Sequence, residues 1–245
     1  IVDIISDVNM AYSEHARRYL ADCGLPKERT YVTGSPMAEV LHNNLVEIEA
    51  SDVHQRLGLE KGKYILLSAH REENIDTEKN FMSLFNAINR MAEKYDMPIL
   101  YSCHPRSRNR LAASGFKLDP RVIQHEPLGF HDYNCLQMNA FAVVSDSGTL
   151  PEESSFFTSV GHPFPAICIR TSTERPEAID KGDFIIAGID EKSLLQAVDT
   201  AVELCRDGLH GIPVPDYVDE NVSTKVIKII QSYVGIVNKM VWRKF

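Results

Sequence analysis

The chain has 245 residues, and its 26 lysines and arginines against 34 aspartates and glutamates give a formal net charge of −8. This acidic balance argues against a general nucleic-acid-binding protein, which would present a basic surface. No apolar run approaches the roughly 20 residues that span a bilayer, and Asp3 and Asp7 interrupt the apolar start that a signal peptide would need. The five cysteines form no CxxC pair, so no disulfide framework or zinc ribbon is predicted and a reducing cytoplasm is expected.

The first fifty residues are expected to be the last part of another structural unit. The chain opens at Ile1 rather than at Met, in a run that resembles the middle of a folded element, so we expect a trimmed or processed chain. Ser13 and Gly24 suit the two ends of a helix, and Pro36 suits the first turn of another. The predicted elements of this region are strands over 8–12 and 31–34 and helices over 13–24, 36–48 and 51–57.

From residue 63 onward, short apolar runs alternate with amphipathic segments, which is the pattern of βα units on a parallel sheet. The segment 77–95 carries apolar residues three and four positions apart, as one face of a helix requires. The connection 208–219 is rich in glycine, proline and acidic residues and is predicted to be an extended surface loop. The predicted strands are 63–68, 98–102, 122–124, 142–145, 166–169 and 184–187, and the further helices are 133–139, one from 150, 191–206 and 224–241.

Chemically active side chains follow five of these strands. Parallel strands end at one edge of their sheet, and ligands of open parallel sheets bind at that edge. Packing alone would not place histidine, arginine, Ser-Gly and carboxylates there, so we expect a binding site. The five segments are 69–74, 103–106, 125–130, 146–153 and 170–177.

Ser147 and Gly148 stand where a helix begins, which favours an anion because free backbone N–H groups and the helix dipole meet there. An ordinary N-cap is the alternative interpretation. Arg71, Arg106 and Arg175 are predicted near the same edge and can fork onto phosphate oxygens, so a diphosphate is the better prediction. The chain has neither a GxxxxGK[ST] nor a GxGxxG motif, which disfavours an ATPase and a standard dinucleotide site.

Glu153 could accept hydrogen bonds from both hydroxyls of a ribose; alternatively, it or Glu152 provides favourable charge at a helix N-terminus. His70 is either a structural hydrogen-bonding residue or a group near the diphosphate. The histidines and glutamates show no HExxH or His-x-His spacing, so no metal site is predicted.

Three sequence blocks together resemble the non-hydrolysing UDP-N-acetylglucosamine 2-epimerases, in the family's order and at nearly its spacing. The blocks are His70-Arg71-Glu72-Glu73-Asn74, Ser145-Asp146-Ser147-Gly148-Thr149-Leu150-Pro151-Glu152-Glu153 and Thr173-Glu174-Arg175-Pro176-Glu177. Tyr12-Ser13-Glu14 and Val32-Thr33-Gly34-Ser35-Pro36 are similar to the family's crossover region, so the resemblance covers essentially the whole chain.

The resemblance implies an α/β fold of two facing Rossmann-like domains, as in GT-B glycosyltransferases, with UDP held in the cleft, no cofactor and a homodimer. It implies that Ser147 and Gly148 contact the phosphates, Glu153 the ribose, and Arg175 the nucleotide. It also implies that Tyr133 lies near the uracil and that His70 is an active-site histidine. Family members eliminate UDP to give a 2-acetamidoglucal and then re-add it with C2 inverted.

By this resemblance, residues 1–48 are the tail of an N-terminal domain with the crossover, and 49–221 form the UDP-binding domain. Residues 222–245 form a helix that packs back toward the N-terminal domain. Most of that domain, which supplies the acidic groups for proton transfer, is missing from this chain, so we place no general base and expect a UDP-holding half that is inactive alone.

The segments 129–133 and 154–165 are more similar to the family branch that acts on 6-deoxy sugars and makes UDP-N-acetyl-L-fucosamine for capsule or O-antigen polysaccharide. Two alternatives stay open. A GT-B glycosyltransferase would use the same UDP-holding parts, and a non-catalytic UDP-sugar-binding module would need no acidic groups for proton transfer.

Overall fold

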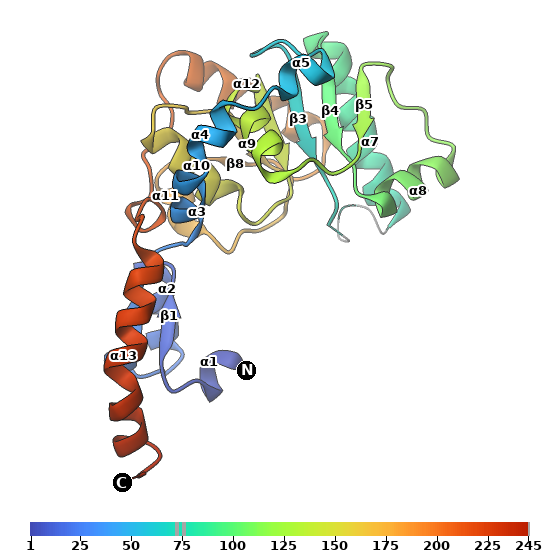
Figure 1. Cartoon of the computed structure of the whole chain (residues 1–245). Helices are drawn as coiled ribbons and strands as arrows, with labels where there is room; N and C mark the ends of the chain where they lie inside the picture. Colours follow the sequence, from blue (N-terminus) through green and yellow to red (C-terminus); the bar gives the residue numbers. More distant parts are fainter. Residues whose placement is uncertain (72–73, 75–76, 245) are drawn as a thin grey trace.

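The computed structural model describes residues 1–71, 74 and 77–244, so Glu72 and Glu73 of the His70 block lie outside the described residues. A larger unit is built around a six-stranded parallel sheet, and a smaller unit combines the two ends of the chain (Figure 1). No helix among the described residues is both long and apolar enough to cross a membrane.

The sheet of the larger unit has the strand order β5-β4-β3-β6-β7-β8, with every neighbouring pair parallel. Counted from β3, this is the 3-2-1-4-5-6 order of a doubly wound Rossmann sheet. The chain order therefore reverses direction between β3 and β6, and the carboxyl ends of the strands at such a reversal are where ligands of doubly wound sheets bind. The strands are β3 Ile65–Ser68, β4 Ile99–Ser102, β5 Val122–His125, β6 Ala142–Ser145, β7 Ala166–Cys168 and β8 Ile185–Ile186.

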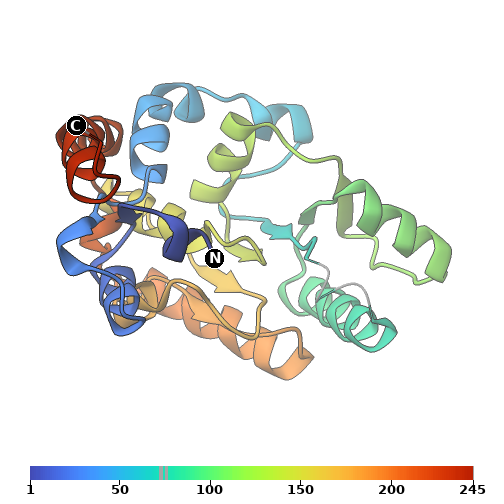
Figure 2. The ribbon, with the colours of Figure 1, turned by 90° about the horizontal axis from the view of Figure 1, so that it is seen from below.

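Helices cover both faces of this sheet, as Figure 2 shows. One face packs against α7 (Glu78–Tyr95), α8 (Pro105–Ser114) and α12 (Glu191–Arg206). The other face packs against α3 Met37–Asn43, α4 Leu45–Glu49, α5 Val53–Leu57, α9 Phe130–Met138, α10 Leu150–Ser159 and α11 Pro176–Asp180.

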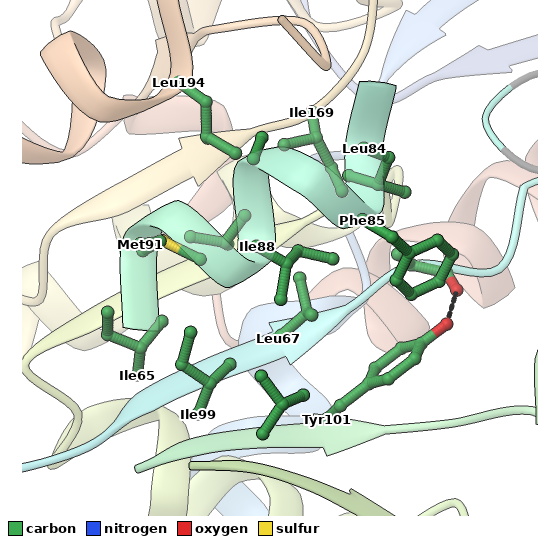
Figure 3. Close-up of a cluster of buried hydrophobic side chains, with 14 of the residues drawn as sticks. Ile65, Leu67, Leu84, Phe85, Ile88, Met91, Ile99, Tyr101, Ile169 and Leu194 are labelled. Atoms are coloured by element: carbon green, nitrogen blue, oxygen red, sulfur yellow. Dashed lines mark hydrogen bonds between the residues drawn. The ribbon is translucent and has the colours of Figure 1, made fainter. Parts of the chain in front are cut away.

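Alternating strand residues supply the two cores, because successive side chains of a strand point to opposite faces. Ile65 and Leu67 of β3 face α7, whereas Leu66 between them faces the opposite helices. Figure 3 shows the α7 side, where Phe85 lies over Tyr101 of β4. The buried Tyr101 hydroxyl donates to the carbonyl oxygen of Ala69 at 2.8 Å, so this core also fixes the end of β3.

The smaller unit is built from a short parallel pair, β1 (Asn9–Ala11) and β2 (Thr30–Val32), with α1 Val2–Ile5, α2 Glu14–Asp22, the 3-10 turn η1 Lys27–Arg29 and α13 Val222–Met240. Figure 1 shows α13 running beside β1 and α2. Lys225 of α13 donates to the carbonyl oxygen of Thr33 at 3.0 Å, and the ring of Tyr233 meets that of Tyr31 edge-on. The C-terminal helix therefore packs on the N-terminal strands.

The predicted fold class, an α/β chain with a parallel doubly wound sheet, is confirmed, and so are the six strands from residue 63 onward. The helix predicted over 36–48 is interrupted at Asn44, which caps α3 and starts α4. Helices α8 and α11 were not predicted, because each begins at a proline in a polar segment that follows a strand.

The prediction of an extended surface loop over 208–219 is confirmed only in part: residues 209–214 form neither helix nor strand and several are exposed, but the segment is anchored at its end. The segment contains the 3-10 turn η2 (Pro215–Tyr217), and the side chains of Val214 and Tyr217 are buried. The Tyr217 hydroxyl also donates to a Glu177 carboxylate oxygen. Composition rich in glycine and proline does not reveal that two apolar anchors hold the segment against α10 and α11.

Candidate functional site

The carboxyl edge of the sheet, where its strands end, is organised around one buried carboxylate. Asp146 follows β6 and is fully buried. Its Oδ2 accepts hydrogen bonds from the backbone N–H groups of His70 and Arg71, each at 2.8 Å, and from Asn74 Nδ2 at 3.1 Å. Asn74 Nδ2 also donates to the carbonyl oxygen of Ile169 at 3.0 Å. Three strand ends, those of β3, β6 and β7, are thereby joined.

Sequence reasoning assigned no role to Asp146 or Asn74, although both stand inside the blocks that carried the resemblance. An aspartate directly after a buried strand was the available signal. Its partners could not be found from spacing, because they lie 72 to 76 residues away along the chain.

His70 lies beside this carboxylate, and its side chain is 47% exposed. The imidazole Nδ1 is 3.4 Å from Asp146 Oδ1 and 3.4 Å from the Ser68 hydroxyl oxygen. The backbone of His70 is thus fixed by the buried site while its ring stays open to a ligand.

Arg71 lies across the strand end toward Gly148. Its Nε donates to the carbonyl oxygen of Asp146 at 2.9 Å. A Cβ added to Gly148 would stand 3.6 Å from Arg71 Nη2, so the guanidinium and the glycine backbone line one surface. The structure therefore brings together Arg71 and Gly148, which the sequence predicted at one edge.

The segment at the start of α10 differs in part from the expected anion site. The N–H of Ser147 donates to the Ser145 hydroxyl at 3.0 Å, and the N–H of Thr149 donates to the Ser147 hydroxyl at 3.3 Å. Two of the N–H groups that were expected to be free are therefore already bonded. Short hydroxyl side chains can compete for nearby backbone groups in this way.

Glu153, on the first turn of α10, is nearly fully buried. Its Oε1 accepts from the Thr149 hydroxyl and its Oε2 from Gln137 Nε2, both at 2.8 Å. Burial raises the pKa of Glu153, while these two donors act against the rise. Gln137 was not predicted to belong to this site, since nothing in the sequence places α9 beside α10.

Tyr133 of α9 points its phenol into the same region. Burial raises the pKa of Tyr133, and the nearby Glu153 carboxylate adds to the rise. The hydroxyls of Ser145 and Ser68 act in the opposite direction. Tyr133, Glu153 and the ends of β3 and β6 are therefore neighbours in the structure.

Arg106 and Arg175 follow β4 and β7, respectively. Arg106 is exposed on the first turn of α8, where Ser107 makes the contact with Ala69, at 3.4 Å from hydroxyl to carbonyl oxygen. Arg175 faces the smaller unit, with its guanidinium 5.4 Å from the centroid of the Tyr12 ring.

Arg175 Nη2 lies 3.3 Å from Glu152 Oε1, which also accepts from the Ser35 hydroxyl at 2.9 Å. Burial raises the pKa of Glu152, and the positive charge of Arg175 acts against the rise. This second carboxylate site joins α10 to the segment that contains Ser35, directly before α3.

The described residues contain no group of three or more histidine, cysteine, aspartate or glutamate side chains arranged to hold a metal ion. The five cysteines are all free thiols.

Comparison with known proteins identifies a family for this chain. The profile of the UDP-N-acetylglucosamine 2-epimerases matches residues 1–231. The chain belongs to this family. The UDP-N-acetylglucosamine 2-epimerase of Methanocaldococcus jannaschii is 28% identical over 207 residues, which are 81% of this chain and 55% of that protein.

Solved structures of family members share the fold. The UDP-N-acetylglucosamine 2-epimerase of Rickettsia bellii has a TM-score of 0.88 and 39% identity, over 99% of this chain and 64% of that one. The Methanocaldococcus jannaschii enzyme in complex with UDP-GlcNAc and UDP has a TM-score of 0.82 and 26% identity, over 94% of this chain and 62% of that one. The GT-B-type fold class is confirmed, and the chain spans 55% to 64% of the length of these epimerases.

Proposed function

We propose that this chain is the UDP-holding part of an enzyme that inverts C2 of a UDP-N-acetylhexosamine. The observation that carries the proposal is the arrangement at the strand reversal, where Arg71, Gly148 and Glu153 follow β3 and β6. A Methanocaldococcus jannaschii relative crystallised with UDP-GlcNAc and UDP supports the same ligand class. Residues 1–48 and the helix over 222–245 are assigned to a second domain, and residues 49–221 to the UDP-binding domain.

Each candidate residue has a proposed part in holding the substrate. Arg71 and the Ser147-Gly148 backbone bind the diphosphate, because a guanidinium and N–H groups at a helix start both favour phosphate oxygens. Glu153 accepts hydrogen bonds from the ribose hydroxyls through the lone pairs that Thr149 and Gln137 leave unused. Tyr133 lies against the uracil.

Arg106 and Arg175 complete the proposed contacts from the two sides of the crevice. Arg106 on α8 reaches the sugar side of the diphosphate, and Arg175 beside Glu152 reaches the nucleotide from the crossover.

The proposed reaction has two steps. A base removes the C2 proton, the electron pair of that C–H bond forms the C1=C2 bond, and the C1–O bond breaks to release UDP. A proton then returns to the other face of C2 while a UDP oxygen re-forms the bond to C1. Arg71 stabilises the charge of the departing diphosphate, and His70 stands beside it as an active-site group.

The finer substrate assignment is also part of the proposal. The segments 129–133 and 154–165 favour a 6-deoxy substrate of the UDP-N-acetyl-L-fucosamine branch, used for capsule or O-antigen polysaccharide. The UDP-GlcNAc/UDP-ManNAc pair is the other candidate.

We further propose that the protein is a homodimer. Light scattering on the purified protein would test this.

Calorimetry with UDP tests the binding role of Glu153. Glu153→Gln is expected to weaken UDP binding about tenfold, because a charge-assisted hydrogen bond is replaced by a weaker one. Glu203→Gln, at an exposed glutamate on α12, is the matched control and should bind as the parent does. Equal affinity of the parent for UDP and for 2′,3′-dideoxy-UDP would contradict the proposed contact between Glu153 and the ribose.

Turnover in D₂O by the protein that carries this chain separates the candidate functions. Deuterium at C2 of the product, with free UDP and the glucal as side products, is the epimerase result. Sugar transfer to an acceptor without exchange at C2 would indicate a GT-B glycosyltransferase. UDP-sugar binding with neither reaction would indicate a binding module.

A further inference from the structure

We infer that Asp146 is a positioning residue for His70, which it holds with one carboxylate oxygen on the backbone and the other on the ring. The inference rests on the proposed function, since it is His70 at the UDP site that Asp146 would orient. It adds a residue to which neither sequence reasoning nor the resemblance assigned a role.

The two oxygens of Asp146 have different surroundings. Oδ2 is saturated by the N–H groups of His70 and Arg71 and by Asn74 Nδ2. Oδ1 is buried and has no hydrogen-bond partner within the described part of the chain. The polar group that approaches it is His70 Nδ1, at 3.4 Å. An unsatisfied oxygen of a fully buried carboxylate is costly, so a donor on the imidazole Nδ1 is strongly favoured.

This geometry selects one ring orientation and one tautomer. With its proton on Nδ1 and directed to Asp146, the imidazole presents Nε2 to the ligand side. The 3.4 Å separation is longer than a good hydrogen bond, and such contacts tighten when a ligand closes the site. The backbone bonds to Oδ2 keep the ring from moving away along the chain.

The other polar groups around His70 do not replace Asp146. The Ser68 hydroxyl also reaches Nδ1 but carries no charge, and it can rotate to accept or donate. Arg71 on the same loop is a cation directed toward Gly148. Tyr133 from α9 is a phenol whose pKa is raised. Asp146 is thus the carboxylate that faces the imidazole in the described part of the chain.

Asp146→Asn separates the two functions of the carboxylate. The amide oxygen can remain at the Oδ2 position, where three donors converge, and this places the NH₂ group at the Oδ1 position facing His70. The loop keeps its anchor while the ring loses its acceptor. Asp183→Asn is the matched control, because Asp183 is also a buried aspartate but precedes β8 at the opposite edge of the sheet.

The ring ¹⁵N shifts of His70 in the UDP-free chain are the first measurement. The parent is expected to show the Nδ1–H tautomer. Asp146→Asn is expected to show the Nε2–H tautomer, because the amide NH₂ group then faces Nδ1 as a donor. Asp183→Asn should leave the tautomer unchanged, and a retained Nδ1–H tautomer in folded Asp146→Asn would overturn the inference.

Two further measurements test the role of Asp146. If Asp146→Asn does not fold, the ring ¹⁵N shifts of His70 in the parent still decide, since the Nε2–H tautomer would contradict the proposed orientation. In the turnover assay, Asp146→Asn should lower kcat about tenfold with KM within a factor of about three. An unaltered kcat would also overturn it.

The failure of the proposed function has a different signature. In that case UDP would not bind the parent chain and no exchange at C2 would occur. The tautomer of His70 would nevertheless change in Asp146→Asn, because that measurement requires no ligand.

Discussion

Two buried aspartates at opposite edges of one sheet differ in what surrounds them. Asp146, at the carboxyl edge, has three donors on Oδ2 and an imidazole near Oδ1. Asp183, before β8 at the amino edge, has the Ser155 hydroxyl on Oδ2, and Oδ1 has no hydrogen-bond partner within the described residues. Burial raises the pKa of Asp183 to about 6.

The difference follows from the geometry of a parallel sheet. At the carboxyl edge, loops leave the strands and turn their N–H groups and polar side chains toward a common crevice. At the amino edge, chain segments pack closely for stability. Ser155 accepts from the N–H of Val214 at 3.2 Å, so Asp183 and Ser155 fasten the segment that leads to α13. We therefore expect substitutions at the amino edge to change stability, and those at the carboxyl edge to change binding.

The largest effect on stability is expected for Gly211→Ala at the amino edge. A Cβ on Gly211 would stand 2.6 Å from the backbone nitrogen of Asp183 and closer still to the Gly182 carbonyl oxygen. Because these are backbone atoms, the 208–219 segment must shift, and we expect a loss of about 3 kcal/mol in the free energy of unfolding. Urea denaturation measures it.

Gly235→Ala is the control for that experiment. Gly235 lies on α13, and nothing stands within 4 Å of its added Cβ. Alanine there should leave the stability unchanged or raise it by up to about 1 kcal/mol, because alanine favours helix. If the two substitutions changed the free energy of unfolding equally, close packing at Gly211 would not be the cause of the loss.

A smaller effect, which depends on pH, is expected for Asp183→Asn. The pKa of Asp183 rises from 3.8 to about 6 on folding, so the folded state holds this proton more tightly than the unfolded chain does. Its contribution to stability is therefore complete below about pH 4 and is lost as the pH rises through about 6.

Relative to the parent, Asp183→Asn should gain about 2 kcal/mol in the free energy of unfolding between pH 4 and pH 7. Urea denaturation of both proteins at the two pH values gives this difference. A constant difference across that range would show that Asp183 is ionised normally in the folded chain.

The smallest effect on stability is expected for Gly148→Ala at the carboxyl edge. The added Cβ meets Arg71 Nη2 at 3.6 Å, which is an ordinary contact, so the free energy of unfolding should change by less than about 1 kcal/mol. The methyl group would nevertheless occupy the surface proposed for the diphosphate. UDP affinity measured by calorimetry is expected to fall about tenfold. Unchanged affinity would contradict the proposed phosphate contact at Gly148.

The positions of the strands could be predicted from the sequence, because each strand is a short apolar run bounded by polar residues. β6 was predicted at 142–145 and lies at Ala142–Ser145. The helix 191–206 was likewise predicted at its observed limits. Asn44 and the starts of α8 and α11 were missed, because proline and polar residues there suit a turn as well as a helix.

The site was only partly readable. Ser147, Gly148 and Arg71 could be placed at the carboxyl edge, because polar residues that directly follow the strands of a parallel sheet lie there. The convergence of His70, Arg71 and Asn74 on Asp146, and of Gln137 on Glu153, was not found. The three arginines were expected near one edge. The structure places Arg71 beside Gly148, and it places Arg175 beside Glu152 in the first turn of α10.

What the sequence alone determined is local and periodic: which segments form strands and helices, and which residues stand at the strand ends. Hydrophobic spacing carries that information because each element buries one face. Only the tertiary structure decided which strand ends meet and which buried oxygen faces which donor. Those pairings depend on the strand order and on distances between residues far apart in the chain, which no spacing along the chain records.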